Sequence, residues 1–186
     1  YKNNEKLITF LIDFGKMNPS DDNPETGRPY LLDIAMMGNQ EVLKMFVSAG
    51  APIDSRDAKG LNAAMLIIQA QGEKSVGMVN FLLQNGLDPN SQDTKGNTLL
   101  VYAINTGSVP LVQKVLENGA DVNLRNAKGR TPIFAAAESN NIEIVKLLLE
   151  YGANPKIKDK NGVTPSLAAV QLGDMEIYDL LEAQGK

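Results

Sequence analysis

The sequence lacks two residue types on which much protein chemistry depends: it has 186 residues, no cysteine and no histidine. Without cysteine, the chain can form neither a disulfide nor a thiolate metal site. Without histidine, it lacks the side chain that most often serves as a general base and that activates a serine nucleophile. We therefore expect that the protein is not an enzyme and that it binds no cofactor and no metal ion.

Two further features of the composition limit the kinds of partner that the protein could bind. No stretch approaches the ~18 consecutive apolar residues of a membrane span, and the net charge of −4 disfavours bulk binding to nucleic acid or anionic lipid. We expect a soluble monomer with no nucleic-acid or membrane partner. The compartment stays open, because the absence of cysteine fits a cytoplasmic protein and a bacterial periplasmic or secreted one. The chain begins at Tyr1 without methionine, so we expect that an upstream segment is missing.

Glycine, by contrast, recurs at a nearly fixed interval. One series has spacings of 33, 36, 33 and 33 residues, and a second has spacings of 35, 36, 33, 33 and 33. A period near 33 residues is typical of proteins built from stacked repeats, in which each unit contacts mainly its neighbours. The two series are Gly27, Gly60, Gly96, Gly129 and Gly162, and Gly15, Gly50, Gly86, Gly119, Gly152 and Gly185.

The clearest copy of the repeat begins with a turn from Asn126 to Gly129. Thr131 is a suitable N-cap, and Pro132 suits the first position of a short helix. A polar break then precedes a second helix with one broad apolar side. Gly152 is expected to end that helix in a left-handed conformation. Each copy thus predicts a turn followed by two helices.

These residues resemble the ankyrin repeat. N-A-K-G-R-T-P-I-F-A-A-A at residues 126–137 is similar to the family pattern D-x-x-G-x-T-P-L-H-x-A-A, and I-V-K-L-L-L-E-Y-G-A at residues 144–153 is similar to I-V-x-L-L-L-x-x-G-A. The resemblance implies an all-α ankyrin-repeat solenoid of antiparallel helix pairs with projecting β-hairpin loops, or fingers. It also implies a concave face, formed by the fingers and first helices, that in this family usually binds other proteins.

The repeat pattern predicts one ankyrin-repeat domain over residues 1–186. A partial repeat covers residues 1–22, with a second helix expected at Lys6–Phe14. Complete copies are expected at residues 23–56, 57–92, 93–125, 126–158 and 159–186. The second helix of the last copy carries Tyr178 and Glu182 where the preceding copy has apolar residues, which predicts a wetter outer face and the end of the array.

The chain departs from the family pattern at the histidine position, which holds Leu32, Met65, Val101, Phe134 and Leu167. In the family this histidine usually forms a hydrogen bond toward the hairpin backbone. We expect apolar packing to replace that link and the fingers to be held less rigidly. Extra residues also appear between the helices at 71–74 and in the long polar first hairpin. Both are expected to be surface loops, which either reflect neutral drift or contact a partner.

Acidic residues recur in the turns, at Asp57, Asp93 and Asp159, with Asn126 at the equivalent position. We expect their side chains to accept hydrogen bonds from nearby backbone N–H groups. The adjacent pair Asp21-Asp22 lies in a Pro-flanked turn without further oxygen ligands at the spacing of a calcium loop. We interpret it as a solvated turn.

The cations gather in or beside the hairpins, whereas many acids fall on the second helices. Two interpretations stay open: exposed loops simply hold charges, or a basic row steers an acidic partner. The basic residues are Arg28, Arg56, Lys59, Lys95, Arg125, Lys128, Arg130, Lys156, Lys158 and Lys160. Met36 and Met37 end the first helix of their copy. They could form an adaptable contact or pack under the first hairpin.

Together these features predict a non-catalytic protein-interaction module that binds another protein, with an acidic surface, on its concave face. The alternative is a targeting domain of a longer enzyme or secreted effector whose catalytic part lies upstream. The residues expected to bind the partner are Arg28, Met36, Met37, Arg56, Lys59, Gln69, Lys95, Asn97, Asn105, Lys128, Arg130, Glu138, Lys160 and Gln171.

Overall fold

The computed structural model describes residues 18–184. The chain divides into two compact units, residues 1–88 and 89–186, and each is described by itself. The helix expected at Lys6–Phe14 lies outside the described residues, as do the glycines at 15 and 185. The expectation of one domain stays a prediction.

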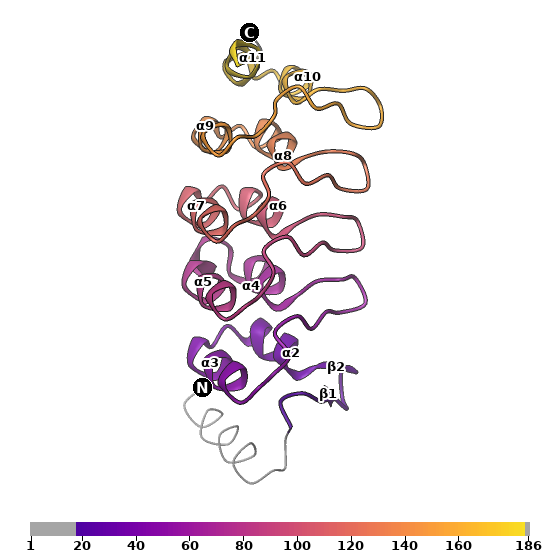
Figure 1. Cartoon of the computed structure of the whole chain (residues 1–186), viewed down its shortest axis with the longest axis vertical. Helices are drawn as coiled ribbons and strands as arrows, with labels where there is room; N and C mark the ends of the chain where they lie inside the picture. Colours follow the sequence, from indigo (N-terminus) through magenta and orange to yellow (C-terminus); the bar gives the residue numbers. More distant parts are fainter. Residues whose placement is uncertain (1–17, 185–186) are drawn as a thin grey trace. The chain divides into compact units, whose positions relative to one another are not determined.

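Within the described residues, the first unit contains the helix pairs α2–α3 and α4–α5, each preceded by a finger (Figure 1). The second pair is interrupted by a short 3₁₀ helix between its two α-helices. In chain order the elements are β1 (Asp22–Asn23), β2 (Arg28–Pro29), α2 (Tyr30–Met37), α3 (Gln40–Ser48), α4 (Ala63–Gln71), η1 (Gly72–Ser75) and α5 (Val76–Gln84).

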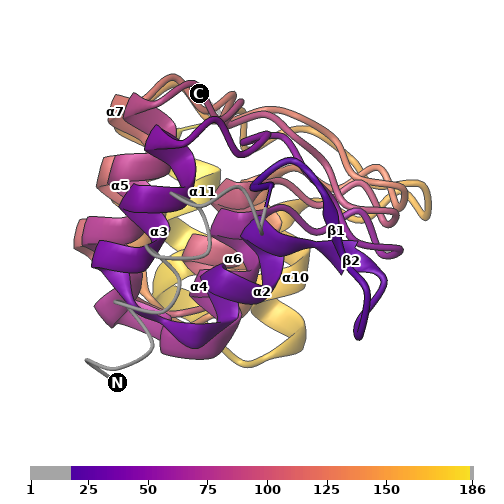
Figure 2. The same ribbon diagram turned by 90° about the horizontal axis from the view of Figure 1, so that it is seen from below.

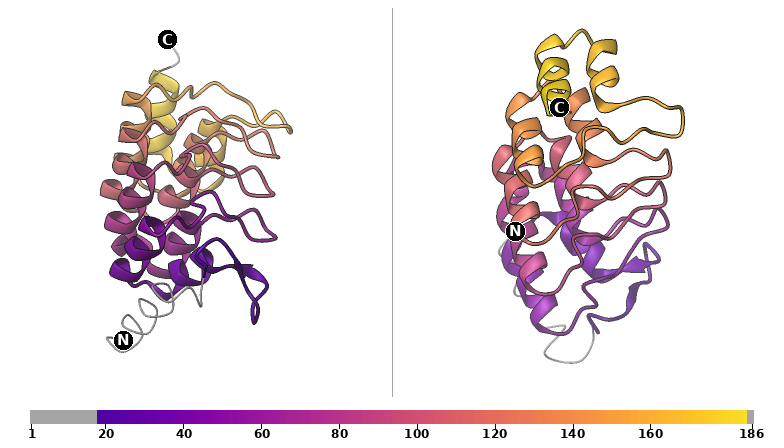
Figure 3. Two further views of the ribbon diagram at one scale, coloured as in Figure 1. Left: turned by 60° about the horizontal axis from the view of Figure 1, so that its bottom comes forward. Right: turned by 45° about the horizontal axis from the view of Figure 1, so that its top comes forward.

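The second unit contains three helix pairs that stack in chain order (Figure 1). Its fingers precede the first helix of each pair and project to the same side, away from the second helices (Figures 2 and 3). The elements are α6 (Leu99–Ile104), α7 (Val109–Glu117), α8 (Pro132–Glu138), α9 (Ile142–Glu150), α10 (Pro165–Gln171) and α11 (Met175–Ala183).

Helix α9 shows how the sequence pattern forms the core. Ile144, Val145 and Leu148 are fully buried, whereas Glu143 and Lys146 are exposed. These positions follow the helical period, so one side of the helix packs inward and the other meets water. The amphipathic second helix predicted from the sequence is therefore present.

The ends of the helices in the second unit also follow the predicted rules. Pro132 and Pro165 occupy the first helical turn, where their missing N–H group would have no partner. Asn141 caps α9 by accepting the N–H of Ile144. The chain leaves α9 through Gly152, whose φ of +84° suits glycine, as predicted.

The fingers are the predicted hairpins, with little regular strand. Among the described residues, paired strands form only in the first finger, where Asp22 faces Pro29 and Asn23 faces Arg28. The second and third fingers each contain one isolated antiparallel bridge, between Arg56 and Asn62 and between Gln92 and Thr98. In the finger at residues 126–130, the N–H of Asn126 donates to the carbonyl of Arg130, and the N–H of Gly129 donates to the carbonyl of Asn126.

The extra residues between the helices of the second copy are helical rather than an irregular loop. Helix α4 continues to Gln71, and Gly72–Ser75 form η1. Glu73 and Lys74 are exposed, whereas Ser75 is buried and its hydroxyl donates to the carbonyl of Gly72 at 2.6 Å. The predicted surface position is therefore correct, but the predicted loop is wrong.

The last helix pair exposes more apolar surface than the sequence predicted. Leu167 is 48% exposed, although Phe134, which has the same position in the preceding copy, is 1% exposed. Glu182 is exposed and Tyr178 half-buried, as expected of a wetter face. The other large apolar side chains exposed on this pair are Val170, Leu172 and Met175.

Candidate functional site

Each later finger is organised by one acidic or amide side chain. The Oδ1 atom of Asp93 accepts the N–H groups of Lys95 and Asn97, both at 2.8 Å. Asn126 accepts those of Lys128 and Arg130 in the same way. Asp57 and Asp159 repeat the arrangement in their own fingers. This confirms the structural role predicted for these residues, because each carboxylate or amide oxygen fixes the backbone of its turn.

A tyrosine links the finger at Asp93 to its first helix. The hydroxyl of Tyr102, on α6, donates to Oδ2 of Asp93 at 2.8 Å. Burial raises the pKa of Asp93, but the backbone N–H of Asn97 and the Tyr102 hydroxyl outweigh it and lower the pKa below the ordinary 3.8. The finger is thus held by a hydrogen bond to an ionised carboxylate, which is stronger than a bond between neutral groups.

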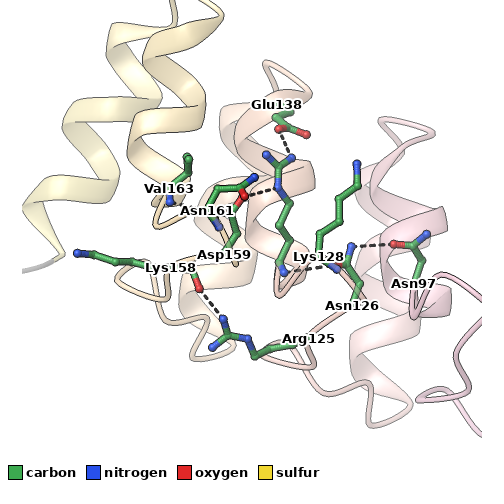
Figure 4. Close-up of polar contacts among 10 residues, drawn as sticks. Asn97, Arg125, Asn126, Lys128, Glu138, Lys158, Asp159, Asn161 and Val163 are labelled. Carbon is green, nitrogen blue, oxygen red and sulfur yellow. Dashed lines mark hydrogen bonds and ion pairs between the residues drawn. The ribbon is translucent and has the colours of Figure 1, made fainter.

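Arg130 links two neighbouring copies through Glu138 and Asp159, which are labelled in Figure 4. Its Nη1 donates to Oε1 of Glu138 at 2.6 Å, and its Nε donates to Oδ2 of Asp159 at 3.0 Å. Its guanidinium also lies 5.3 Å from the ring centroid of Phe134, within cation–π range. Burial raises the pKa of Asp159, but the hydrogen bond from Arg130 and the N–H groups of its own turn outweigh it and lower that pKa below 3.8.

The first finger is held by Asp33 on α2. Oδ2 of Asp33 accepts from Nδ2 of Asn23 at 2.6 Å and from the hydroxyl of Thr26 at 2.7 Å, while its Oδ1 pairs with Arg28 at 2.7 Å. One carboxylate thus fixes both strands and the turn between them.

These polar contacts differ from the expectation that apolar packing replaces the hydrogen bond of the family histidine to the finger. Leu32, Met65 and Phe134 are buried, so packing does occupy the histidine position in those copies. Packing is not the only connection, however, because Asp33, Tyr102 and Arg130 supply polar links in three copies. The sequence reasoning missed Asp33 and Tyr102. The available signal was their shared position, one residue after the histidine position, where other copies have leucine or alanine.

Two threonines at the start of first helices have side-chain hydroxyls without a hydrogen-bond partner among the described residues. Thr98 and Thr131 are each 2% exposed, and neither hydroxyl has a partner among the described residues. Thr131 therefore stands at the predicted N-cap position without capping the helix. Thr164, at the same position in the last copy, accepts the N–H of Leu167 at 3.3 Å and bonds to Ser166 at 2.9 Å.

Neighbouring fingers of the second unit are joined through their backbones. The N–H of Ala127 donates to the carbonyl of Lys95 at 2.9 Å, and the N–H of Lys160 donates to the carbonyl of Lys128 at 3.0 Å. A side-chain bond from Asn126 to Asn97 reinforces the first of these contacts (Figure 4). The fingers therefore form a connected row rather than independent loops.

A groove of about 510 Å³ lies between these fingers and the helices α6 and α8. Val101 and Ala135, both half-buried, lie on its helical side. Six residues predicted to bind a partner line the groove together: Lys95, Asn97, Asn105, Lys128, Arg130 and Glu138. The other eight predicted residues do not line it.

Those eight lie in several places. In the first unit, Arg28 is paired with Asp33, and Met36 and Met37 are 47% and 43% exposed, so neither methionine is packed out of solvent under the first hairpin. Lys59 and Gln69 are exposed in the same unit, which also contains Arg56. In the second unit, Lys160 is exposed on the last finger and Gln171 is exposed at the end of α10.

The basic residues of the fingers fall into two groups. Arg28 and Arg130 are held in ion pairs with acids of the fold. Lys95, Lys128 and Lys160 are exposed, and no ion pair joins them to a carboxylate within residues 18–184. On the opposite side, Glu143 and Glu150 of α9 are exposed. Lys95, Lys128 and Lys160 are therefore exposed cations that an arriving partner would meet.

A second hollow, of about 580 Å³, lies between the last finger and α11. Lys156 and Lys158 line it together with Asp179 and Glu182, so its charges are mixed. In the part of the chain that the structure describes, no group of three acidic side chains could hold a metal ion. No helix among these residues is long and apolar enough to cross a membrane.

The repeat geometry agrees with comparison to known proteins. A family model described as ankyrin repeats (3 copies) matches residues 31–126, 64–159 and 100–185. The chain therefore belongs to the ankyrin-repeat family, whose members are generally protein-interaction modules. Protein HOS4 of Saccharomyces cerevisiae (strain ATCC 204508 / S288c) is 40% identical over 68 residues, which cover 37% of this chain and 6% of that protein.

Proposed function

We propose that the chain is a non-catalytic module that binds another protein across the fingers and first helices of its second unit. The observation that carries this proposal is the groove between the fingers and the helices α6 and α8, which six independently predicted residues line. Binding sites are commonly concave and lined by apolar surface with a few placed polar groups. This groove has both, because Val101 and Ala135 lie beside two lysines and an ion pair.

The links that hold the fingers in place also support this surface as the binding site. The Tyr102 and Arg130 links hold the fingers against the first helices, and backbone bonds join each finger to the next. A surface that is already ordered loses less conformational entropy when a partner binds. The proposed lack of catalysis rests on composition, since the sequence has neither histidine nor cysteine.

A second candidate is that the array positions a longer protein on its target. The similar segment of Protein HOS4 makes up 6% of that protein, so an array of this kind can be a small part of a large chain. In this case the groove would still bind a protein, and the catalytic or effector activity would lie elsewhere.

The absence of cysteine offers a direct test. A single cysteine can be introduced at Asn105, which lines the groove, or at Glu143, which is exposed on α9. Each variant is labelled with a bulky maleimide and used for affinity capture beside the unlabelled protein. We expect the label at position 105 to abolish capture of the partner and the label at position 143 to leave it unchanged. The opposite pattern would place binding on the second helices and contradict the proposal.

A further inference from the structure

Lys95 and Lys128 occupy the same position in successive fingers, two residues after Asp93 and Asn126. The carbonyl of Lys95 accepts the N–H of Ala127, so the two fingers are held side by side at this point. Both lysines are exposed and line the groove. Their ammonium groups form no ion pair with any carboxylate of residues 18–184. Two unpaired positive charges therefore stand along one wall of the groove.

The acids around the groove are already engaged. Asp93 accepts two backbone N–H groups and the hydroxyl of Tyr102. Glu138 pairs with Arg130 at 2.6 Å, and Arg130 in turn pairs with Asp159. These partners hold the three carboxylates in place, and within residues 18–184 none of the three forms an ion pair with Lys95 or Lys128. Lys95 and Lys128 are thus exposed cations at the groove of a protein whose net charge is −4.

The apolar part of the groove is small. Phe134 lines it but is only 1% exposed and lies beneath the guanidinium of Arg130. Val101 and Ala135, which are half-buried, and Ala127, which is exposed, form apolar surface that a ligand could touch. Because these side chains are small and aliphatic, we expect an aliphatic side chain of the ligand to contact them.

We propose that the groove of the second unit selects an extended acidic peptide segment of the partner. Carboxylates of that segment lie against Lys95 and Lys128, and one aliphatic side chain contacts Val101 and Ala135. This inference rests on the proposed function and adds the chemistry of the bound segment. Charge complementarity supports it, since unpaired lysines in a rigid wall attract carboxylates without first breaking an internal ion pair.

The test is selection from a random library of displayed twelve-residue peptides against the immobilised full chain. We expect enriched peptides to carry aspartate or glutamate next to an aliphatic residue. Their affinity should fall roughly tenfold or more for Lys95→Glu/Lys128→Glu, and less for Lys95→Gln/Lys128→Gln, which removes charge without reversing it. The matched control is Glu143→Lys/Glu150→Lys on α9, which should bind as the wild type does. A thermal melt confirms that each variant is folded.

Contrary outcomes separate the inference from the proposed function. If the enriched peptides are neutral or basic and the label at position 105 blocks their binding, the inference is wrong but the groove remains the binding site. Peptides that the label does not block would contradict the proposed site as well. No enriched peptide, or a single-stranded oligonucleotide bound with the same dependence on Lys95 and Lys128, would also overturn the inference.

Discussion

The copies at residues 126–158 and 159–184 share a sequence pattern but use it differently. Phe134 is buried, whereas Leu167, at the same position of the next copy, is 48% exposed. The hydroxyl of Thr131 has no partner among the described residues, whereas that of Thr164 caps its helix. Asn126 is neutral where Asp159 is charged and bound by Arg130. Residue type and position in the array therefore both decide what each motif residue contributes. Matched substitutions in the two copies test this.

The largest difference is expected in the core. Phe134→Ala removes a buried aromatic side chain and should cost about 3–5 kcal/mol. Leu167→Ala removes a half-exposed side chain and should cost about 1 kcal/mol or less. Chemical denaturation followed by circular dichroism measures both changes. Equal losses would show that Leu167 is packed as well as Phe134, and the comparison would fail.

The link between the two copies should be the next largest contribution. Arg130→Met removes both ion pairs and leaves the carboxylate of Asp159, whose side chain is 2% exposed, without its cation. An acid that loses its partner while buried destabilises a fold, so we expect the melting temperature to fall by several degrees. Lys146→Met, at an exposed position of α9, is the control and should change it little. Similar melting temperatures for the two variants would show that the Arg130 link is dispensable.

The charge difference between Asn126 and Asp159 predicts a pH effect. The pKa of Asp159 is lowered in the folded state, so its contribution to stability is present above the ordinary 3.8 and is lost as the pH falls through the folded value. In urea titrations between about pH 5 and pH 2, the wild type should lose stability with acid more steeply than Asp159→Asn. The lowered pKa of Asp93 remains in both proteins, so the variant should keep part of the slope. A slope unchanged by the substitution would refute this role.

The smallest effects should have opposite signs. Thr131→Val keeps the shape of the side chain and removes a buried hydroxyl that has no described partner, so it should stabilise the protein by about 1 kcal/mol. Thr164→Val removes a helix cap and a bond to Ser166, and it should destabilise the protein by about 1 kcal/mol. Denaturation midpoints of the two variants check the signs. A loss of stability in Thr131→Val would mean that its hydroxyl does have a partner.

Much of the fold could be predicted because its rules are local. Glycines with positive φ, prolines in the first helical turn and turn acids that bind their own backbone all act within a few residues. The Arg130 link could not be predicted in this way, because Arg130 and Asp159 are 29 residues apart and meet only when two copies stack. The same holds for the groove. The sequence identified six of its residues, but not that Arg130 would already be paired and Lys95 and Lys128 would not.

The most direct test of the account compares the two faces of the second unit by rate of association. The partner recovered by affinity capture is mixed with Lys95→Glu/Lys128→Glu and with Glu143→Lys/Glu150→Lys by stopped flow at several salt concentrations. We predict that the first pair slows association roughly tenfold or more at low salt, with the difference shrinking as salt rises, and that the second pair does not slow it. If instead reversal on α9 slowed association and reversal on the fingers did not, the partner would bind the second helices and the account would be wrong.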